Sequence, residues 1–145
     1  MKYREIKIME TREFLQQYAA GDRGFDSINL RDCNLSWQYL AEIDLSNADL
    51  SISNLEGVDL TAANLIEANL SRADLTVANL YKANLCGADL SWADLRGAEL
   101  AYASLLGADL TGVSLAGADL SGTIMPDGTI MSDRTIVSKR SLRGI

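Results

Sequence analysis

The stretch from residue 68 to 95 reads ANLSRADLTVANLYKANLCGADLSWADL, with a leucine at every fifth position. The spacing holds without a gap from Leu30 to Leu120, which makes nineteen units. Phe25 extends the column backward, and Met125 and Ile130 extend it forward. The residue two before the leucine is alanine in 12 of the 19 units, and the residue just before it is Asp or Asn in 15. Such a repeat decides the fold, so it is interpreted first.

A period of five fits neither regular secondary structure. On an α-helix, at about 100° per residue, successive leucines would step by about 140° and spread around the cylinder. On a flat strand they would alternate between the two faces, because five is odd. The leucines can share one side only if the chain turns a corner in each unit. Seven of the eleven glycines sit two residues after a leucine, where such a bend would fall. The sequence therefore predicts a coil with the leucine and alanine columns inside.

The units ADLTV (residues 73–77) and ADLSW (residues 88–92) resemble the A-(D/N)-L-X-X motif of the pentapeptide-repeat family. The resemblance covers about residues 25–130 and is strongest to small cyanobacterial-type members that carry an N-terminal capping helix. It implies an all-β solenoid, a right-handed quadrilateral β-helix with four units in each of about five coils. We interpret the Asp and Asn positions as hydrogen-bond partners of the turns and not as catalytic groups.

The segment before the repeat is expected to cap it, because a bare solenoid end exposes apolar core and unpaired strand edges. Thr11 is expected to cap a helix over residues 12–20, and Gly21 to end it. We expect this helix to cover the first coil; a role in dimerisation is the alternative. Its apolar face would consist of Phe14, Leu15 and Tyr18.

The remaining terminal residues complete the division of the chain. Residues 2–8 alternate weakly between apolar and polar and are a candidate edge strand. The MPDGT sequence at residues 125–129 is typical of a turn. We therefore expect an N-terminal segment with its helix at 1–24, the β-helix at 25–130, and a loosely ordered tail at 131–145.

Charge restricts the class of partner. Residues 26–125 carry fourteen acids against four bases, a net charge of −10, within a chain of net charge −7. An acidic rod argues against direct binding to nucleic acid or to an anionic membrane, and it favours a protein partner with a basic surface. No apolar run approaches the roughly 20 residues that cross a bilayer, and the first residues lack a signal-peptide core, so we expect a cytoplasmic protein.

The residues for catalysis are missing from the sequence. It contains no histidine, and its glycine-rich stretch near residue 110 lacks the Gly-Lys-Ser/Thr of a phosphate loop. Two cysteines match no metal-binding spacing; Cys33 replaces an inward alanine and is expected to be buried and inert, whereas Cys86 is expected at the surface. We expect no enzyme, no cofactor and no metal.

If four units form a coil, residues 20 apart stack, and the outward positions form columns. One column contains Ser46, Ile66, Cys86 and Leu106, and another contains Asp32, Ile52, Arg72 and Trp92. Such apolar and aromatic residues on a rod either form an interaction surface or only pack against neighbouring coils. The candidate interaction residues are Ile66, Cys86, Leu106, Tyr39, Tyr81, Tyr102 and Trp92, with Lys82 among the tyrosines and Trp37 and Val77 on a further column.

Two functions fit these observations. The first is a non-enzymatic scaffold for an unknown protein partner, as a monomer or as a homodimer through one end of the solenoid. The alternative, implied by the family resemblance, is an acidic mimic of DNA that binds DNA gyrase or topoisomerase and confers quinolone resistance.

Overall fold

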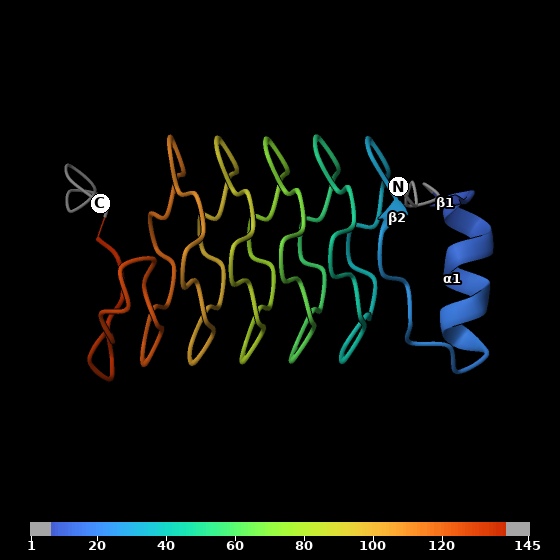
Figure 1. The fold of residues 1–145 in the computed structure, drawn as a ribbon. Helices are drawn as coiled ribbons and strands as arrows, with labels where there is room; N and C mark the ends of the chain where they lie inside the picture. The colour runs from blue at the N-terminus through green and yellow to red at the C-terminus, as the bar shows by residue number, and fades with distance from the viewer. Residues whose placement is uncertain (1–6, 139–145) are drawn as a thin grey trace, which may run out of the picture.

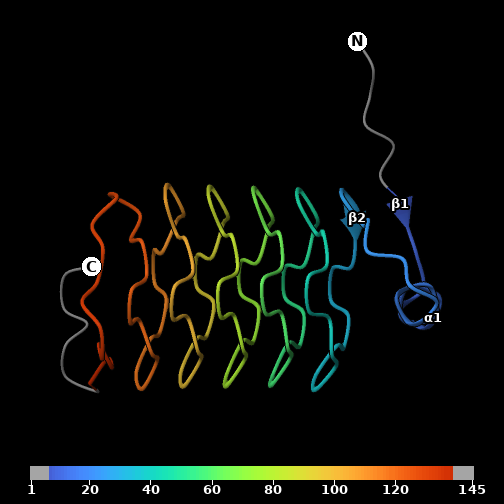
Figure 2. The same cartoon turned by 90° about the horizontal axis from the view of Figure 1, so that it is seen from below.

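The computed structural model describes residues 7–138, and these form a stack of coils with a helix at one end (Figures 1 and 2). The named elements are short: β1 spans Lys7–Ile8, α1 spans Thr11–Ala19, and β2 spans Ile28–Asn29. From there to the last coil, the chain consists of turns joined by isolated parallel bridges. The strands of the expected all-β fold are therefore single bridges, because only three residues lie between one turn and the next.

The bridges join residues 20 apart, which means that four units complete one coil. The ladder that begins at Gly24 and Asp44 reaches Ile124 in steps of twenty residues. Backbone hydrogen bonds between successive coils have the same period. In each of them a leucine N–H donates to the carbonyl 19 residues further along, as the Leu80 N–H does to Glu99 O over 2.7 Å. No unit could be stable alone, since burying one leucine offsets only part of the cost of ordering five residues. The hand and number of the coils stay predictions.

The acidic or amide residue before each leucine holds the following turn. In one unit the Asp74 Oδ1 accepts hydrogen bonds from the Thr76 N–H, at 2.9 Å, and from the Thr76 hydroxyl, at 2.7 Å. Most units repeat the first of these bonds, so the interpretation of the Asp and Asn positions as turn partners is confirmed. The residue two after the leucine then has a positive φ, even where it is Trp37 (φ 61°) or Tyr102 (φ 59°).

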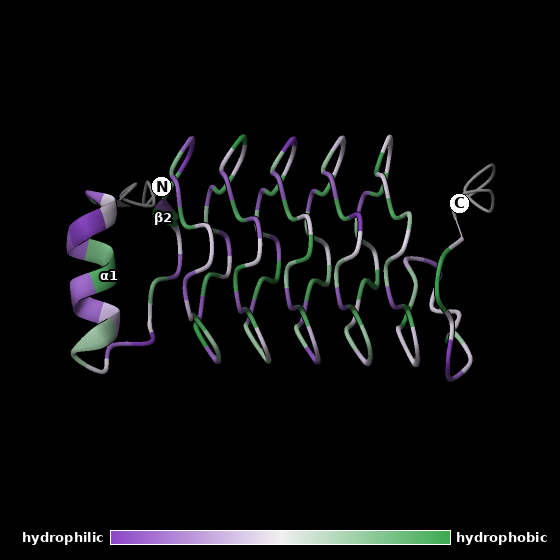
Figure 3. Ribbon diagram, turned by 180° about the vertical axis from the view of Figure 1, so that it is seen from behind, coloured by the Kyte–Doolittle hydropathy of each residue, from purple (hydrophilic) through white to green (hydrophobic). Residues whose placement is uncertain are grey.

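The leucine and alanine columns form the core. Leu80 and Ala78, for example, are both fully buried. Phe25 and Met125 continue the leucine column as predicted, but Ile130 is 68% exposed. The prediction for Ile130 is wrong because Met125 donates its N–H to Thr129 O, which reverses the chain before residue 130. Figure 3 shows hydrophobic and hydrophilic segments alternating along the coils.

Helix α1 covers the first coil, as expected. Phe14 is fully buried, and its ring meets the Phe25 ring edge to face with centroids 4.8 Å apart. The Tyr18 hydroxyl donates to Ala41 O over 2.9 Å. The helix begins at Thr11 with Glu10 as the N-cap and without a side-chain cap, so the assignment of Thr11 as the cap is wrong. Leu15 packs against the core with Tyr18.

Both termini of the described chain add to the ladder. Strand β1 pairs in parallel with β2, Lys7 opposite Ile28, which confirms an edge strand for residues 7–8; residues 2–6 lie outside the described part. At the other end, the chain after the turn runs antiparallel to the last coil, with Asp119 opposite Ile136. A loosely ordered tail is therefore wrong for residues 131–137. The division at residues 24 and 130 stays a prediction.

Candidate protein-interaction surface

Four walls and four corners define the outside of the rod. We number the walls by the units of one coil: wall 1 contains residues 88–92, wall 2 contains 93–97, wall 3 contains 98–102 and wall 4 contains 103–107, together with the residues 20 positions before and after each. The last residue of each range, two positions after the leucine, lies at the corner that leads to the next wall. We call it the corner after that wall. Walls 3 and 4 are neighbours, and the corners after walls 1 and 3 are diagonally opposite.

Wall 4 carries the predicted apolar column. The carbonyls of Ile66, Cys86 and Leu106 each accept an N–H from the preceding coil, which places these residues one above another. Leu106 is 49% exposed, whereas Ile66 and Cys86 are half-buried. The Cys86 sulfur lies 3.1 Å from the Ser104 hydroxyl oxygen. The column therefore exists, with Leu106 as its most accessible member.

Wall 3 brings two of the three predicted tyrosines together. The Tyr81 and Tyr102 rings meet edge to face with centroids 6.0 Å apart, and the Lys82 ammonium lies 5.3 Å from the Tyr81 ring. The Tyr102 hydroxyl donates to Asp133 Oδ1 over 3.2 Å, and the nearby Asp133 charge raises the pKa of Tyr102. Tyr39 is 79% exposed on the same wall, but its rung lies two coils before that of Asn79 and Tyr81.

Trp92 does not join this surface. It occupies the corner after wall 1, diagonally opposite the corner of Tyr102. Trp92 is 62% exposed, and its ring lies over Gly112 of the next coil, where an added Cβ would come within 2.4 Å of it. Trp37 covers Gly57 and Tyr102 covers Gly122 in the same manner. Part of the exposed aromatic surface therefore packs against glycine, as the alternative explanation of these residues proposed.

Sequence reasoning missed these ring-on-glycine pairs, although a signal was present. Each of the three glycines follows its aromatic residue by 20 positions, the length of one coil. The glycines were interpreted only as bends, yet thirteen repeat corners without glycine also have a positive φ. A ring on the preceding coil thus accounts for glycine at residues 57, 112 and 122.

Cys33 lies at the inward position. It is only half-buried, whereas the sequence predicted a buried residue. Desolvation raises its pKa to about 11, with Asp32 adding to the shift and a backbone hydrogen bond opposing it. Near neutral pH this sulfur is therefore a thiol, consistent with the expected lack of reactivity.

The described surface carries one ion pair within a single turn. Arg96 and Asp94 form an ion pair over 2.6 Å at the surface, two residues apart. Side-chain hydrogen bonding to Arg96 is the largest cause that lowers the pKa of Asp94. Among residues 7–138, no three His, Cys, Asp or Glu side chains gather as metal ligands would. No helix in the described part is long and apolar enough to cross a membrane.

The class that this architecture defines is a solenoid of stacked pentapeptide units. The family model "Pentapeptide repeats" matches residues 28–51, 53–91 and 88–125, with eight copies. The chain belongs to the pentapeptide-repeat family, and the resemblance inferred from its sequence is confirmed. A comparison with curated proteins finds no match to the chain.

Solved structures with this fold come from several sources. A pentapeptide repeat protein of the cyanobacterium Cyanothece 51142 is 35% identical, with a TM-score of 0.70 over 75% of this chain and 88% of that one. One from the Arabidopsis thaliana thylakoid lumen is 26% identical, with a TM-score of 0.66 over 75% and 73%. QnrB1, a plasmid-mediated fluoroquinolone resistance protein, has a TM-score of 0.66 at 21% identity over 70% of this chain and 52% of that one, so it shows the fold alone.

Proposed function

We propose that this protein is a non-enzymatic, cytoplasmic scaffold that binds a protein partner through walls 3 and 4. The observation that carries the proposal is the adjacency of two apolar features across one corner. The Tyr81–Tyr102 pair lies at the turn that ends wall 3, and Leu106 lies at the next turn along the chain, four residues after Tyr102. Tyrosine and exposed aliphatic groups are typical of the centre of a protein interface.

Acidic groups around these features favour a partner with a basic surface. Glu99 is exposed on wall 3, and Glu67 is exposed at the corner after wall 4. Charge of one sign around an apolar centre accelerates association with a partner of opposite charge and discriminates against acidic partners. The binding surface would then combine an apolar centre with an acidic rim.

The Leu106→Arg variant tests this surface. We expect its recovery of partner from an extract of the source cells to fall at least tenfold, since a charge at the interface centre would be desolvated (about 1.4 kcal/mol for each factor of ten). The matched control is Val77→Arg, because Val77 is 51% exposed against 49% for Leu106 and lies at the corner after wall 2. Equal recovery by the wild type and both variants, with unchanged circular dichroism, would contradict the proposal.

The gyrase-binding alternative has one structural observation in its favour. Acidic residues occur on every wall: Asp89 on wall 1, Asp94 on wall 2, Glu99 on wall 3 and Asp44 on wall 4. A rod with negative charge all around presents a potential of the same sign as duplex DNA. This candidate predicts that micromolar protein protects gyrase supercoiling from a quinolone. If adding the protein changes the supercoiling rate neither in the presence nor in the absence of the drug, this candidate is excluded.

A further inference from the structure

Two exposed aromatic residues occupy neighbouring positions in the first coil, near the end that α1 covers (Figure 1). Trp37 lies at the corner after wall 2 and is 62% exposed, and Tyr39 lies two residues further along, on wall 3. Two coils separate Tyr39 from the rung of Tyr81. A site at Trp37 therefore lies apart from the Tyr81–Tyr102 pair, and its existence does not depend on the function proposed above.

The Trp37 ring is held with one face against the next coil. An added Cβ on Gly57 would lie 2.3 Å from the Cε3 atom of the ring, and 2.4 and 2.5 Å from Cζ3 and Cδ2, the two ring atoms bonded to Cε3. An approach within the ring plane would bring only Cε3 so close, so Gly57 lies against the face of the ring. Because the residue is 62% exposed, the opposite face of the indole is directed to solvent.

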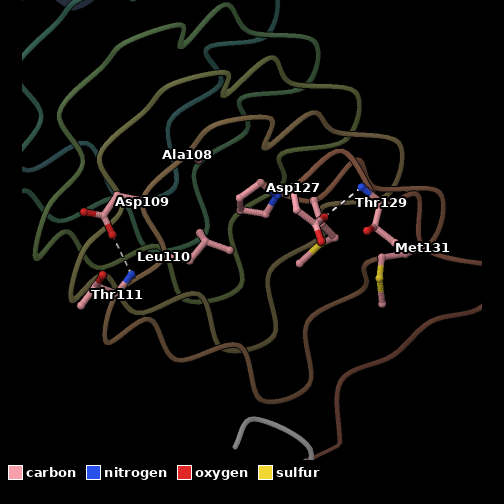
Figure 4. Close-up of a pocket in the computed structure, with 9 residues that line it drawn as sticks. Ala108, Asp109, Leu110, Thr111, Asp127, Thr129 and Met131 are labelled. Atoms are coloured by element: carbon pink, nitrogen blue, oxygen red, sulfur yellow. Dashed lines mark hydrogen bonds between the residues drawn. The ribbon is translucent and has the colours of Figure 1, made fainter. Parts of the chain in front are cut away.

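This pair of residues presents an exposed ring face and not a hollow. A pocket of about 540 Å³ lies at the other end of the rod, where Figure 4 shows Ala108, Leu110 and Met131 in its lining. Trp37 and Tyr39 do not border that pocket. A ligand of the aromatic pair would therefore be bound by the ring face and by nearby charge, and not by enclosure.

Both aromatic residues have a carboxylate neighbour on the next coil. The Trp37 N–H donates to Glu56 O over 2.8 Å, which places Glu56 beside Trp37 along the rod. Tyr39 and Asp59 form a parallel bridge, so their side chains leave wall 3 about 4.8 Å apart. In these two coils, walls 2 and 3 contain no base, and a third acid, Glu42, ends wall 3. The charge around the two rings is therefore negative.

Tyr39 occupies a position that the fold alone would fill differently. In 15 of the 19 units the residue before the leucine is Asp or Asn. Its side-chain oxygen accepts the N–H two residues further along, as Asp44 Oδ1 does from the Ser46 N–H over 3.0 Å. The phenol oxygen of Tyr39 lies too far out on its ring to do this for Ala41. A residue that breaks the local rule and brings an aromatic ring to the surface is typical of a functional position.

An exposed indole face beside carboxylates is a site for a cation. The face of a tryptophan ring attracts a guanidinium or ammonium group more strongly than the face of tyrosine or phenylalanine. A guanidinium fits best, because its plane stacks on the ring while its N–H groups donate to carboxylate oxygens. The chain itself contains a contact of this kind: the Arg23 guanidinium carbon lies 3.9 Å from the centroid of the Tyr18 ring.

We propose that Trp37 and Tyr39 form a binding site for an arginine side chain of a protein partner. The guanidinium stacks on the open face of Trp37, and the Glu56 carboxylate accepts its N–H groups. Tyr39 borders the site on wall 3, and Asp59 adds negative charge beside it. Because Gly57 and the backbone bond to Glu56 already fix Trp37, little freedom is lost when the arginine binds.

NMR of the two indole N–H resonances of the full chain tests the site, at about 0.15 M salt. The probe is a blocked tetra-arginine peptide, and the control peptide contains citrulline, which has the shape of arginine without its charge. We expect a saturable shift of the Trp37 resonance with the arginine peptide only. Trp92 is the internal control: it is equally exposed and also packs on a glycine, but Arg72 lies one coil before it at the same corner. Its resonance should move little.

Variants separate the ring from the charge. Trp37→Ala is expected to raise the Kd of the arginine peptide about fivefold, followed through the Gly57 amide. Glu56→Gln keeps the shape of the side chain and is expected to raise the Kd about threefold. The matched control is Glu99→Gln, which removes an exposed acid from wall 3 three coils away from Tyr39 and leaves the Kd unchanged.

Three results would overturn the arginine site. The first is a shift of the Trp92 resonance as large as that of Trp37, which would mean that the peptide binds anywhere on the acidic rod. The second is an equal response to the citrulline peptide, because the site would then not recognise charge. The third is the same Kd in Glu56→Gln as in Glu99→Gln, which would leave the carboxylate beside Trp37 without a role.

Discussion

Leu80→Ala is expected to lower the free energy of unfolding by about 3 kcal/mol. Leu80 is fully buried, and Leu60 and Leu100 lie one coil before and after it in the same column. The substitution removes buried apolar surface and leaves a cavity that the bridges above and below cannot close, because each coil is fixed to both neighbours. The measurement is urea unfolding followed by circular dichroism.

The control for this experiment is Leu106→Ala, the same chemical change at a side chain that is 49% exposed. Its expected cost is below about 1 kcal/mol, as for surface substitutions. Tryptophan fluorescence gives a second measure of the transition, since Trp37 and Trp92 lie in different coils. A cost at Leu80 no larger than that at Leu106 would show that the coils do not share one rigid core.

The interior of the protein could be predicted because the five-residue spacing of the leucines determines it. A leucine at every fifth position has a common interior only in a chain that bends once per unit, so burial of Leu80 and Ala78 followed from the spacing. The role of the Asp and Asn residues followed as well, because a short side-chain acceptor two positions before a turn N–H is a local feature. Neither inference required knowledge of contacts between distant residues.

The ends and the surface could not be predicted in the same way, because they depend on which coil is the last. Ile130 continues the sequence column, but the turn at residues 125–129 sends it to the outside. Residues 131–137, which pair antiparallel with the last coil, do not continue the five-residue repeat, and their pairing depends on the edge left open by that coil. Trp92 was grouped with Tyr102 for its chemistry, whereas counting units in fours places the two residues at opposite corners.

Gly112→Ala is expected to cost about 3 kcal/mol, of which about 1 reflects the positive φ and about 2 the displacement of a ring. The backbone φ is +68°, and an added Cβ would lie 2.4 Å from the Trp92 ring. Because an added Cβ would overlap three atoms of the ring, the ring has to leave this position and lose its packing on the next coil. We expect a red shift of the Trp92 fluorescence to accompany the loss of stability.

Gly107→Ala separates the two contributions. Gly107 has nearly the same φ, +69°, but the nearest atom to its added Cβ is a backbone nitrogen at 3.9 Å. Its expected cost is therefore only the backbone contribution of about 1 kcal/mol. In the Trp92→Ala background, Gly112→Ala should fall to the same value, since the ring is absent; a cost still near 3 kcal/mol in that background would show that the backbone, and not the ring, requires glycine at this corner.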